Sequence, residues 1–303
     1  MTPVVGRKAT GLVAATFTPL TPEGEINLSE IRPYIDYLLE QQGVKSIFVN
    51  GTTGEGMSLT VEERKLLAVE WCHQGKNKLE QVIVHVGCLS LKDSQELVSH
   101  PCHNLDFLSL LCFLPLNSDA LRMFLQEVAA AAPAMPFYYY HIPAVTGVNL
   151  RSRDVLEGIE NQIPSFQGLK FSGSDLMDFG QCVSYSPSHW SLLYGIDEQL
   201  LGALAMGANG AVGSTYNYLG SSVNKLVSAF DKGDLPKART IQFQVQDILC
   251  YAIKLGFDLA VNKQLMSEVS GLALGPPRLP LLPCPHPKAL SIAQRLQQIL
   301  GDQ

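Results

Sequence analysis

Short apolar runs alternate with amphipathic stretches along most of this 303-residue chain. The runs are rich in β-branched and aromatic residues and are apolar almost throughout, as is typical of parallel strands covered on both faces. Eight candidate strands span residues 11–19, 44–51, 81–87, 106–115, 136–143, 166–173, 190–197 and 210–217. This alternation predicts βα units with a parallel sheet, and eight such strands close naturally into a barrel.

The stretches between these runs repeat apolar residues at intervals of three and four, which predicts helices with one buried face. In the first helix, Asn27 with Glu30 three residues later predicts the start, and Gly43 predicts the end. Thr60 followed by Glu63 predicts a second capping box, at the start of the next helix.

The chain after the eighth candidate strand is helical by pattern. One helix closes the eighth βα unit, and three more are predicted over about 234–256, 258–270 and 287–300. The proline-rich stretch 276–287 predicts a loop between the last two. We therefore expect an α/β fold in which residues 1–303 form a single domain. This domain is a (β/α)₈ TIM barrel over about 8–233 with a C-terminal helical extension over about 234–303.

Composition narrows the class of partner and the compartment. The net charge of −6 disfavours nucleic acid and anionic membranes as partners. No apolar run reaches the roughly 18 residues that a membrane-spanning helix needs. The first ten residues lack the apolar core of a signal peptide. The seven cysteines, an odd number without a Cys-x-x-Cys pair, predict free thiols. Together these features predict a cytoplasmic protein.

Active sites of such barrels lie at the carboxyl ends of the strands. The polar residues that end the apolar runs are therefore the candidates for chemistry, and we expect them to meet at one mouth. They are Thr52, Thr53, Tyr140, His141, Lys170, Ser172, Asp197, Glu198, Ser214 and Tyr216.

Lys170 is the strongest of these candidates. It lies between Leu169 and Phe171 in an otherwise uncharged strand. Burial would lower the pKa of its ammonium group from about 10.4 and free the amine to attack a ketone, as a Schiff-base lysine must. The alternative is a lysine that reaches solvent or pairs with Asp175. Lys45 is a useful contrast, because it opens its strand and so belongs to the opposite end of the barrel.

Two further features favour binding and proton transfer. In the loop GTTGEG (51–56), glycines and two hydroxyls suit a small carboxylate, and no Lys-Ser/Thr follows to make a P-loop. Alternation along the fifth run places Tyr138 and Tyr140 on one face and Tyr139 on the other. Tyr140, level with a lysine on the next strand, suits proton transfer, although core packing is the alternative.

A metal site is not predicted. The segment HPCH (100–103) offers two histidines and a cysteine but no fourth ligand, so a chance arrangement is the better interpretation. Asp197 and Glu198 suit hydroxyl groups, a metal or solvent when they are judged from position alone.

Several motifs together carry a resemblance to a known family. They are GTTGEG (51–56), YHIPAVTG (140–147), GLKFSGSD (168–175), GIDE (195–198), GSTYN (213–217) and GPPRLPL (275–281). On these motifs the chain resembles the N-acetylneuraminate lyases, in particular those of vertebrates. These enzymes belong to the pyruvate-dependent class I aldolase superfamily, which includes dihydrodipicolinate synthase.

The resemblance implies a TIM barrel that cleaves N-acetylneuraminate to N-acetyl-D-mannosamine and pyruvate, without a metal or cofactor, as a cytoplasmic homotetramer. It implies that Lys170 forms the Schiff base and that Tyr140 is the catalytic phenol. The residues implied in substrate binding are Thr52 and Thr53 for the carboxylate and Ser172, Gly195, Asp197, Glu198 and Ser214 for the hydroxylated tail.

Dihydrodipicolinate synthases carry an arginine two residues after the proline of the fifth-strand motif, where it grips a second carboxylate. Here Pro143 is followed by Ala144 and Val145, which lack the guanidinium group that binds a carboxylate through two hydrogen bonds.

The segment HPCHNLDFLSLLCFL (100–114) is several residues shorter than the resemblance implies. Two alternatives therefore stay open: a related aldolase for another sugar acid, and a barrel whose catalysis is impaired by the altered segment.

Overall fold

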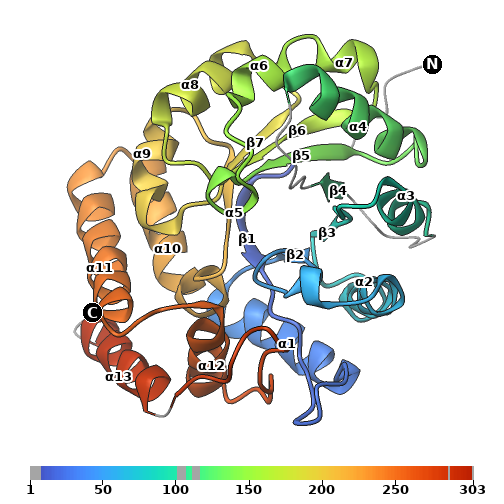
Figure 1. Ribbon diagram of the computed structural model, residues 1–303. Helices are drawn as coiled ribbons and strands as arrows, with labels where there is room; N and C mark the ends of the chain where they lie inside the picture. The colour runs from blue at the N-terminus through green and yellow to red at the C-terminus, as the bar shows by residue number, and fades with distance from the viewer. Residues whose placement is uncertain (1–7, 101–106, 111–116, 286, 302–303) are drawn as a thin grey trace.

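Eight parallel strands form a closed barrel in the computed structural model, which describes residues 8–100, 107–110, 117–285 and 287–301. Each strand pairs with the next along the chain, and β8 returns to pair with β1. Figure 1 shows the strands at the centre with the helices outside them. The strands are β1 (Gly11–Ala15), β2 (Ser46–Val49), β3 (Gln81–His85), β4 (Phe107–Leu110), β5 (Phe137–His141), β6 (Phe166–Phe171), β7 (Ser191–Tyr194) and β8 (Gly210–Gly213). All eight predicted strands are confirmed, and the seven strands other than β4 are shorter than their apolar runs because those runs include loop residues.

The helices follow the strands in the predicted alternation, and four short helical turns join them. The helices are α1 (Ile31–Tyr37), α2 (Val61–Gly75), α3 (Leu91–Ser99), α4 (Ser118–Ala130), α5 (Pro143–Thr146), α6 (Ser152–Leu156), α7 (Ile159–Gln162), α8 (Leu176–Tyr185), α9 (Leu200–Ala205), α10 (Tyr216–Asp231), α11 (Leu235–Lys254), α12 (Leu259–Ser270) and α13 (Lys288–Gly301). The short turns are η1 (Leu28–Glu30), η2 (Leu38–Gln42), η3 (Gly56–Ser58) and η4 (Asp197–Gln199).

The two faces of the strands build two separate cores. Residues that point inward, among them Phe48, Tyr138, Tyr140 and Val212, fill the barrel. Residues that point outward, such as Tyr139, pack against the helices in a larger cluster. The predicted alternation of the three tyrosines is confirmed, and it places the Tyr140 side chain inside the barrel.

The helix termini test the capping predictions. The Thr60 box is confirmed: the Glu63 backbone N–H donates to the Thr60 hydroxyl at 3.2 Å, and the Thr60 N–H donates to the Glu63 carboxylate at 2.8 Å. Gly43 ends the first helical segment with a φ of 62°, also as predicted. The Asn27 prediction is wrong. The chain enters α1 through the 3₁₀ turn η1, and the Asn27 side chain makes no cap bond.

Other partners occupy the two side chains of that predicted box. The Asn27 side-chain oxygen accepts the Ser29 hydroxyl at 2.6 Å. The Glu30 carboxylate accepts the backbone N–H of Ala273 at 3.3 Å, far along the chain. Glu30 therefore bonds to a distant segment of the chain rather than to the backbone N–H of Asn27, as a capping box would require.

The altered segment supplies the fourth strand. Residues 107–110 form β4, which pairs in parallel with β3 and β5, so the barrel is closed despite the short sequence. The rest of the predicted strand 106–115 and most of the connection from α3 lie outside the described residues.

The C-terminal helices lie outside the barrel and pack on one another (Figure 1). α10 follows β8 and closes the eighth βα unit, and α11, α12 and α13 match the three predicted extension helices. The described residues of the proline-rich stretch before α13 form a loop, as predicted. Within the described part of the chain, no helix is both long and apolar enough to cross a membrane.

Candidate active site

A cavity of about 400 Å³ opens at the carboxyl ends of the strands. Nine of the predicted site residues line this single cavity. They are Thr52, Thr53, Tyr140, Lys170, Ser172, Gly195, Asp197, Glu198 and Ser214. Residues at or just after the carboxyl ends of β2, β5, β6, β7 and β8 thus converge, because parallel strands end at the same face of a barrel.

Lys170 is buried at the base of this cavity, with 5% of its surface exposed. Its ammonium nitrogen lies 3.9 Å from the centre of the Phe48 ring and 3.8 Å from that of Tyr140. Burial lowers the pKa of the amine, although the Tyr140 hydroxyl and the Asp197 carboxylate partly oppose this effect. The alternative interpretation is wrong, because Lys170 is buried from solvent and Asp175 instead caps α8, where its carboxylate accepts the Met177 backbone N–H at 2.9 Å.

Tyr140 is held beside Lys170 by the strand register. The two residues are direct partners across β5 and β6. The Tyr140 ring also meets Phe48 and His85 edge-on, with centroids 5.7 and 6.1 Å away. Phe48 and His85 thus pack around the phenol and the amine and hold them side by side, an arrangement that suits proton transfer next to a nucleophile.

The loop that carries Thr52 and Thr53 is closed by its own backbone. The Glu55 N–H donates to the Thr52 carbonyl at 3.1 Å, and the Gly56 N–H donates to the Gly51 carbonyl at 3.1 Å. Gly56 must be glycine, since a Cβ there would lie 2.0 Å from the Asn50 carbonyl oxygen. The turn therefore holds both threonines at the cavity wall.

Asp197 and Glu198 supply the acidic side of the cavity. One Asp197 oxygen accepts both the backbone N–H and the hydroxyl of Thr215, at 2.9 and 2.6 Å. Burial raises the pKa of the Asp197 carboxyl, while the two bonds from Thr215 lower it. Burial also raises the pKa of Glu198. Asp197 and Glu198 both line the cavity, and carboxylate oxygens are hydrogen-bond acceptors.

Two glycines make room for these side chains. A Cβ on Gly213 would lie 1.8 Å from an Asp197 carboxylate oxygen, and one on Gly195 would lie 2.0 Å from the Ser172 hydroxyl oxygen. Neither distance is sterically allowed. The two positions thus need glycine so that the polar groups can approach the strand ends closely.

The C-terminal helices hold the site from outside. The Asn262 amide on α12 donates to the Ser214 hydroxyl at 3.0 Å. On α11, Gln242 donates to the Asp197 carbonyl at 3.3 Å, and Gln246 donates to the Glu198 carbonyl at 2.8 Å. The extension therefore supports three of the predicted site residues.

An apolar wall of the cavity was not predicted. Leu249 and Ile253 on α11, together with Phe257 just after it, line the side that α11 covers. Their spacing of four residues is a helical signal in the sequence, but nothing local shows that this helix leans over the mouth of the barrel. Ala144 and Val145 also line the cavity, at the place where dihydrodipicolinate synthases carry the arginine.

Two predicted mouth residues lie elsewhere. His141 points outward, where its ring contacts Phe171 at a centroid distance of 5.1 Å and its Nδ1 lies 3.2 Å from the Tyr139 hydroxyl. The alternation that turns Tyr140 inward turns its neighbour outward, so the sequence did hold this signal. Tyr216 begins α10 and is fully buried beyond the end of β8.

No group of three or more His, Cys, Asp or Glu side chains is arranged to hold a metal ion within the described ranges. Most of the HPCH segment lies outside those ranges. The cysteines that the structure describes are free, as predicted: Cys72, Cys88, Cys182, Cys250 and Cys284.

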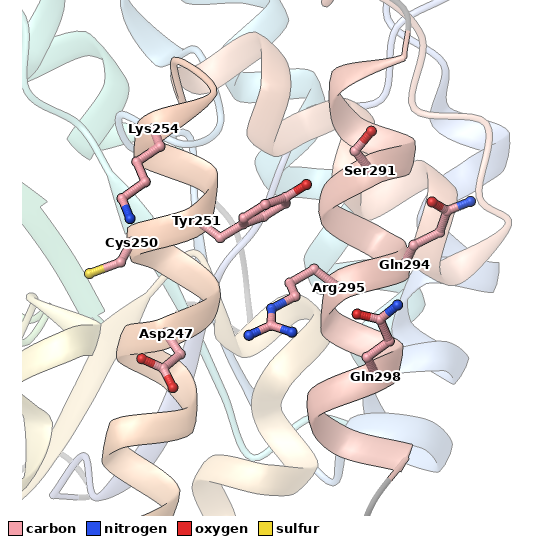
Figure 2. A pocket seen from close by; sticks show the side chains of 8 residues that line it. All are labelled: Asp247, Cys250, Tyr251, Lys254, Ser291, Gln294, Arg295 and Gln298. Carbon is pink, nitrogen blue, oxygen red and sulfur yellow. The ribbon is translucent and has the colours of Figure 1, made fainter.

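A second hollow, of about 510 Å³, lies between α11 and α13. Figure 2 shows Tyr251 and Arg295 extending from these two helices into the space between them. None of the predicted site residues lines this hollow, which lies on the opposite face of α11 from Leu249 and Ile253.

Comparison with known proteins agrees with this geometry. A sequence model of the Dihydrodipicolinate synthetase family matches residues 8–299. The N-acetylneuraminate lyase of Danio rerio is 63% identical over 295 residues, which cover 96% of each chain. The N-acetylneuraminate lyase of Homo sapiens is 56% identical over 280 residues, covering 91% of this chain and 88% of the human one.

Solved structures give the same result. The N-acetylneuraminate lyase of Aliivibrio salmonicida superimposes with a TM-score of 0.90 at 36% identity, covering 96% of this chain and 97% of the other. The sialic acid aldolase of Ruminococcus gnavus, in a form described as a catalytic lysine mutant, gives 0.89 at 27% identity, covering 97% of both. The chain therefore belongs to the Dihydrodipicolinate synthetase family, alongside the vertebrate N-acetylneuraminate lyases.

Proposed function

We propose that this protein cleaves N-acetylneuraminate to N-acetyl-D-mannosamine and pyruvate through a Schiff base on Lys170. The observation that carries the proposal is the position of Lys170: buried, with a lowered pKa, at the base of a polar cavity, and beside Tyr140. The close similarity to the N-acetylneuraminate lyases of Danio rerio and Homo sapiens supports the choice of substrate. The catalytic lysine named for the Ruminococcus gnavus aldolase supports a lysine mechanism.

In this mechanism the neutral Lys170 amine attacks the C2 ketone of the open-chain sugar acid, and loss of water leaves a protonated imine. Tyr140, working with the substrate carboxylate, takes the proton of the C4 hydroxyl while the C3–C4 bond breaks. The bond electrons move into the imine to give an enamine, and N-acetyl-D-mannosamine leaves as the aldehyde. Protonation of the enamine at C3 and hydrolysis of the imine release pyruvate and regenerate the amine.

The remaining residues bind and orient the substrate. Thr52 and Thr53, with the backbone of their loop, hold the carboxylate. Ser172, Gly195, Asp197, Glu198 and Ser214 bind the hydroxylated tail, for which the two carboxylates offer acceptors. Because the protonated imine is the electron sink, the proposed chemistry needs no metal or cofactor.

The direct test is mass spectrometry after incubation with pyruvate and borohydride. A pyruvyl adduct on Lys170 is the expected result, followed by release of N-acetyl-D-mannosamine from N-acetylneuraminate. An adduct with faster cleavage of a deoxygluconate would favour a related aldolase for another sugar acid. No adduct from folded protein would refute the proposal and favour a barrel impaired by the altered segment.

The same similarity supports three further proposals. We propose a cytoplasmic homotetramer in which residues 1–303 fold as a single domain. Light scattering would measure the mass of the assembly, cell fractionation the compartment, and calorimetry the number of unfolding transitions.

A further inference from the structure

A buried ion pair joins the threonine loop to the C-terminal extension. The Lys263 ammonium on α12 lies 2.7 Å from one oxygen of the Glu55 carboxylate. The side chains are 1% and 0% exposed, which makes this pair far more buried than the other ion pairs of the described residues. The partners are 208 residues apart in the sequence.

Both groups make a second bond within the same region. The other Glu55 oxygen accepts the backbone N–H of Arg278 at 2.9 Å. Lys263 also donates to the Pro276 carbonyl at 3.2 Å. Burial lowers the pKa of Lys263, and the carboxylate of Glu55 opposes that effect. The pair is thus enclosed between the loop after β2 and the loop after α12.

A second connection fixes the far side of the same loop. The Arg278 guanidinium donates to both Glu63 oxygens, at 2.8 and 2.5 Å, and to the Ser58 carbonyl at 3.2 Å. Glu63 is the acid of the capping box that starts α2. The segment from the threonines to the start of α2 is therefore held at both ends by residues of the C-terminal extension.

The position of Glu55 connects the pair to the site. Glu55 lies two residues after Thr53 and has a φ of 54°, in the left-handed region that non-glycine residues seldom adopt. Its own N–H donates to the Thr52 carbonyl. Thr52 and Thr53 line the cavity. A shift of the Glu55 side chain would therefore displace the backbone that holds these two threonines there.

Stability alone is a weak reason for such a pair. Removing two charges from water is costly, and apolar replacements of buried ion pairs are often neutral or stabilising. Strain in the backbone persists where the surrounding structure enforces it, often at sites that bind ligands. The location of the pair at the loop of Thr52 and Thr53 supplies the functional reason.

We propose that Glu55 and Lys263 are positioning residues that hold the Thr52–Thr53 loop for the substrate carboxylate. This inference rests on the proposed function, since that function assigns the carboxylate to this loop. Neither side chain lines the cavity, so the pair acts through the threonines. It also gives α12 a role in substrate binding.

The test compares Glu55→Gln, Lys263→Met and the double variant with the wild type. Borohydride trapping of pyruvate at Lys170 gives the half-saturating concentration, the limiting rate and the pH profile, and calorimetry gives the melting temperature. Lys45→Met is the matched control, because it breaks only the exposed Lys45–Glu80 pair at the other end of the barrel. The single variants should melt well below the wild type, because each changes one side of a buried pair.

The double variant decides the question, because it removes both charges together. We expect it to stay folded and to need about tenfold more pyruvate for half-saturation. This is the loss in affinity expected when a hydrogen bond from the threonine loop to the pyruvate carboxylate is misplaced. Its pH profile should match the wild type, since Lys170 keeps its surroundings, and Lys45→Met should leave all values unchanged.

Two outcomes would overturn the inference alone: a folded double variant with wild-type half-saturation, or a double variant that unfolds, which would assign the pair to stability. Absence of an adduct in the wild type would instead refute the proposed function, and this inference with it.

Discussion

The ammonium nitrogen of Lys170 lies 3.8 Å from the centre of the Tyr140 ring, and the two residues are direct register partners on β5 and β6. Inward-facing partners on adjacent parallel strands must lie close together, so the barrel itself sets this distance. Burial of Lys170 favours the neutral amine, which is the nucleophilic form, although the Tyr140 hydroxyl partly opposes this effect. The relationship thus links the strand register to the reactivity of one side chain.

Replacement of Lys170 by Ala should abolish the borohydride-trapped adduct and lower the cleavage rate by roughly 10³-fold or more, because the covalent nucleophile is lost. Mass spectrometry and a pyruvate-release assay would measure the two effects. Lys45→Ala is the control, since Lys45 is exposed outside the cavity, and it should behave like the wild type. A pyruvyl adduct that persists in Lys170→Ala would exclude Lys170 as the nucleophile.

The variant Tyr140→Phe should slow carbon–carbon cleavage by roughly 10² to 10⁴-fold, the usual contribution of a positioned proton carrier. The ring contacts with Lys170 and Phe48 do not need the hydroxyl, so the melting temperature should change little. Steady-state kinetics with N-acetylneuraminate would measure the loss. Tyr138→Phe is the matched control, because Tyr138 faces the same interior but does not line the cavity. Equal rates in the two variants would contradict the role of Tyr140.

Adding one methyl group at Gly213 should damage both the fold and the site. The new Cβ would lie 1.8 Å from an Asp197 oxygen, and overpacking of this kind typically costs about 1–3 kcal/mol. Gly213→Ala should therefore lower the free energy of unfolding in urea and weaken substrate binding.

Gly180→Ala on α8 is the control for Gly213→Ala, because its new Cβ would meet only the Met206 sulfur at 3.5 Å. Alanine is favoured over glycine within a helix, so this variant should be as stable as the wild type or up to about 1 kcal/mol more stable. If Gly213→Ala matched Gly180→Ala in stability and activity, the close approach of Asp197 to Gly213 would not explain the need for glycine at this position.

His141 should make the protein sensitive to acid. Burial lowers its pKa from 6.5 to about 4. The unfolded chain therefore binds a proton below about pH 6.5 that the folded protein accepts only near pH 4, so stability is lost as the pH falls through this window. At the acid end of this pH window, the lowered pKa of His141 corresponds to a loss of about 3 kcal/mol in the free energy of unfolding.

Urea unfolding of the wild type and His141→Gln at several pH values between 7.5 and 4 would test this prediction. The variant should lose less stability over the window, although His85, whose pKa is also lowered by burial, should keep part of the effect. Parallel curves for the two proteins would show that His141 does not contribute.

The sequence by itself determined the features that depend on local patterns. Apolar runs and helical spacing predicted every strand and the extension helices, because periodicity records which face of an element is buried. A lysine within an uncharged strand predicted the buried Lys170, and position at the carboxyl ends of the strands predicted eight of the residues that line the cavity. These inferences need only the period of a strand and the geometry of a parallel barrel.

Only the tertiary structure decided the features that join distant segments. Glu30 bonds to Ala273 rather than to its own helix start, α11 supplies an apolar wall, and Lys263 pairs with Glu55. The physical reason is the same in each case. These contacts depend on how the C-terminal helices pack against the barrel, and the period of a segment shows which face is buried but not which distant segment covers it.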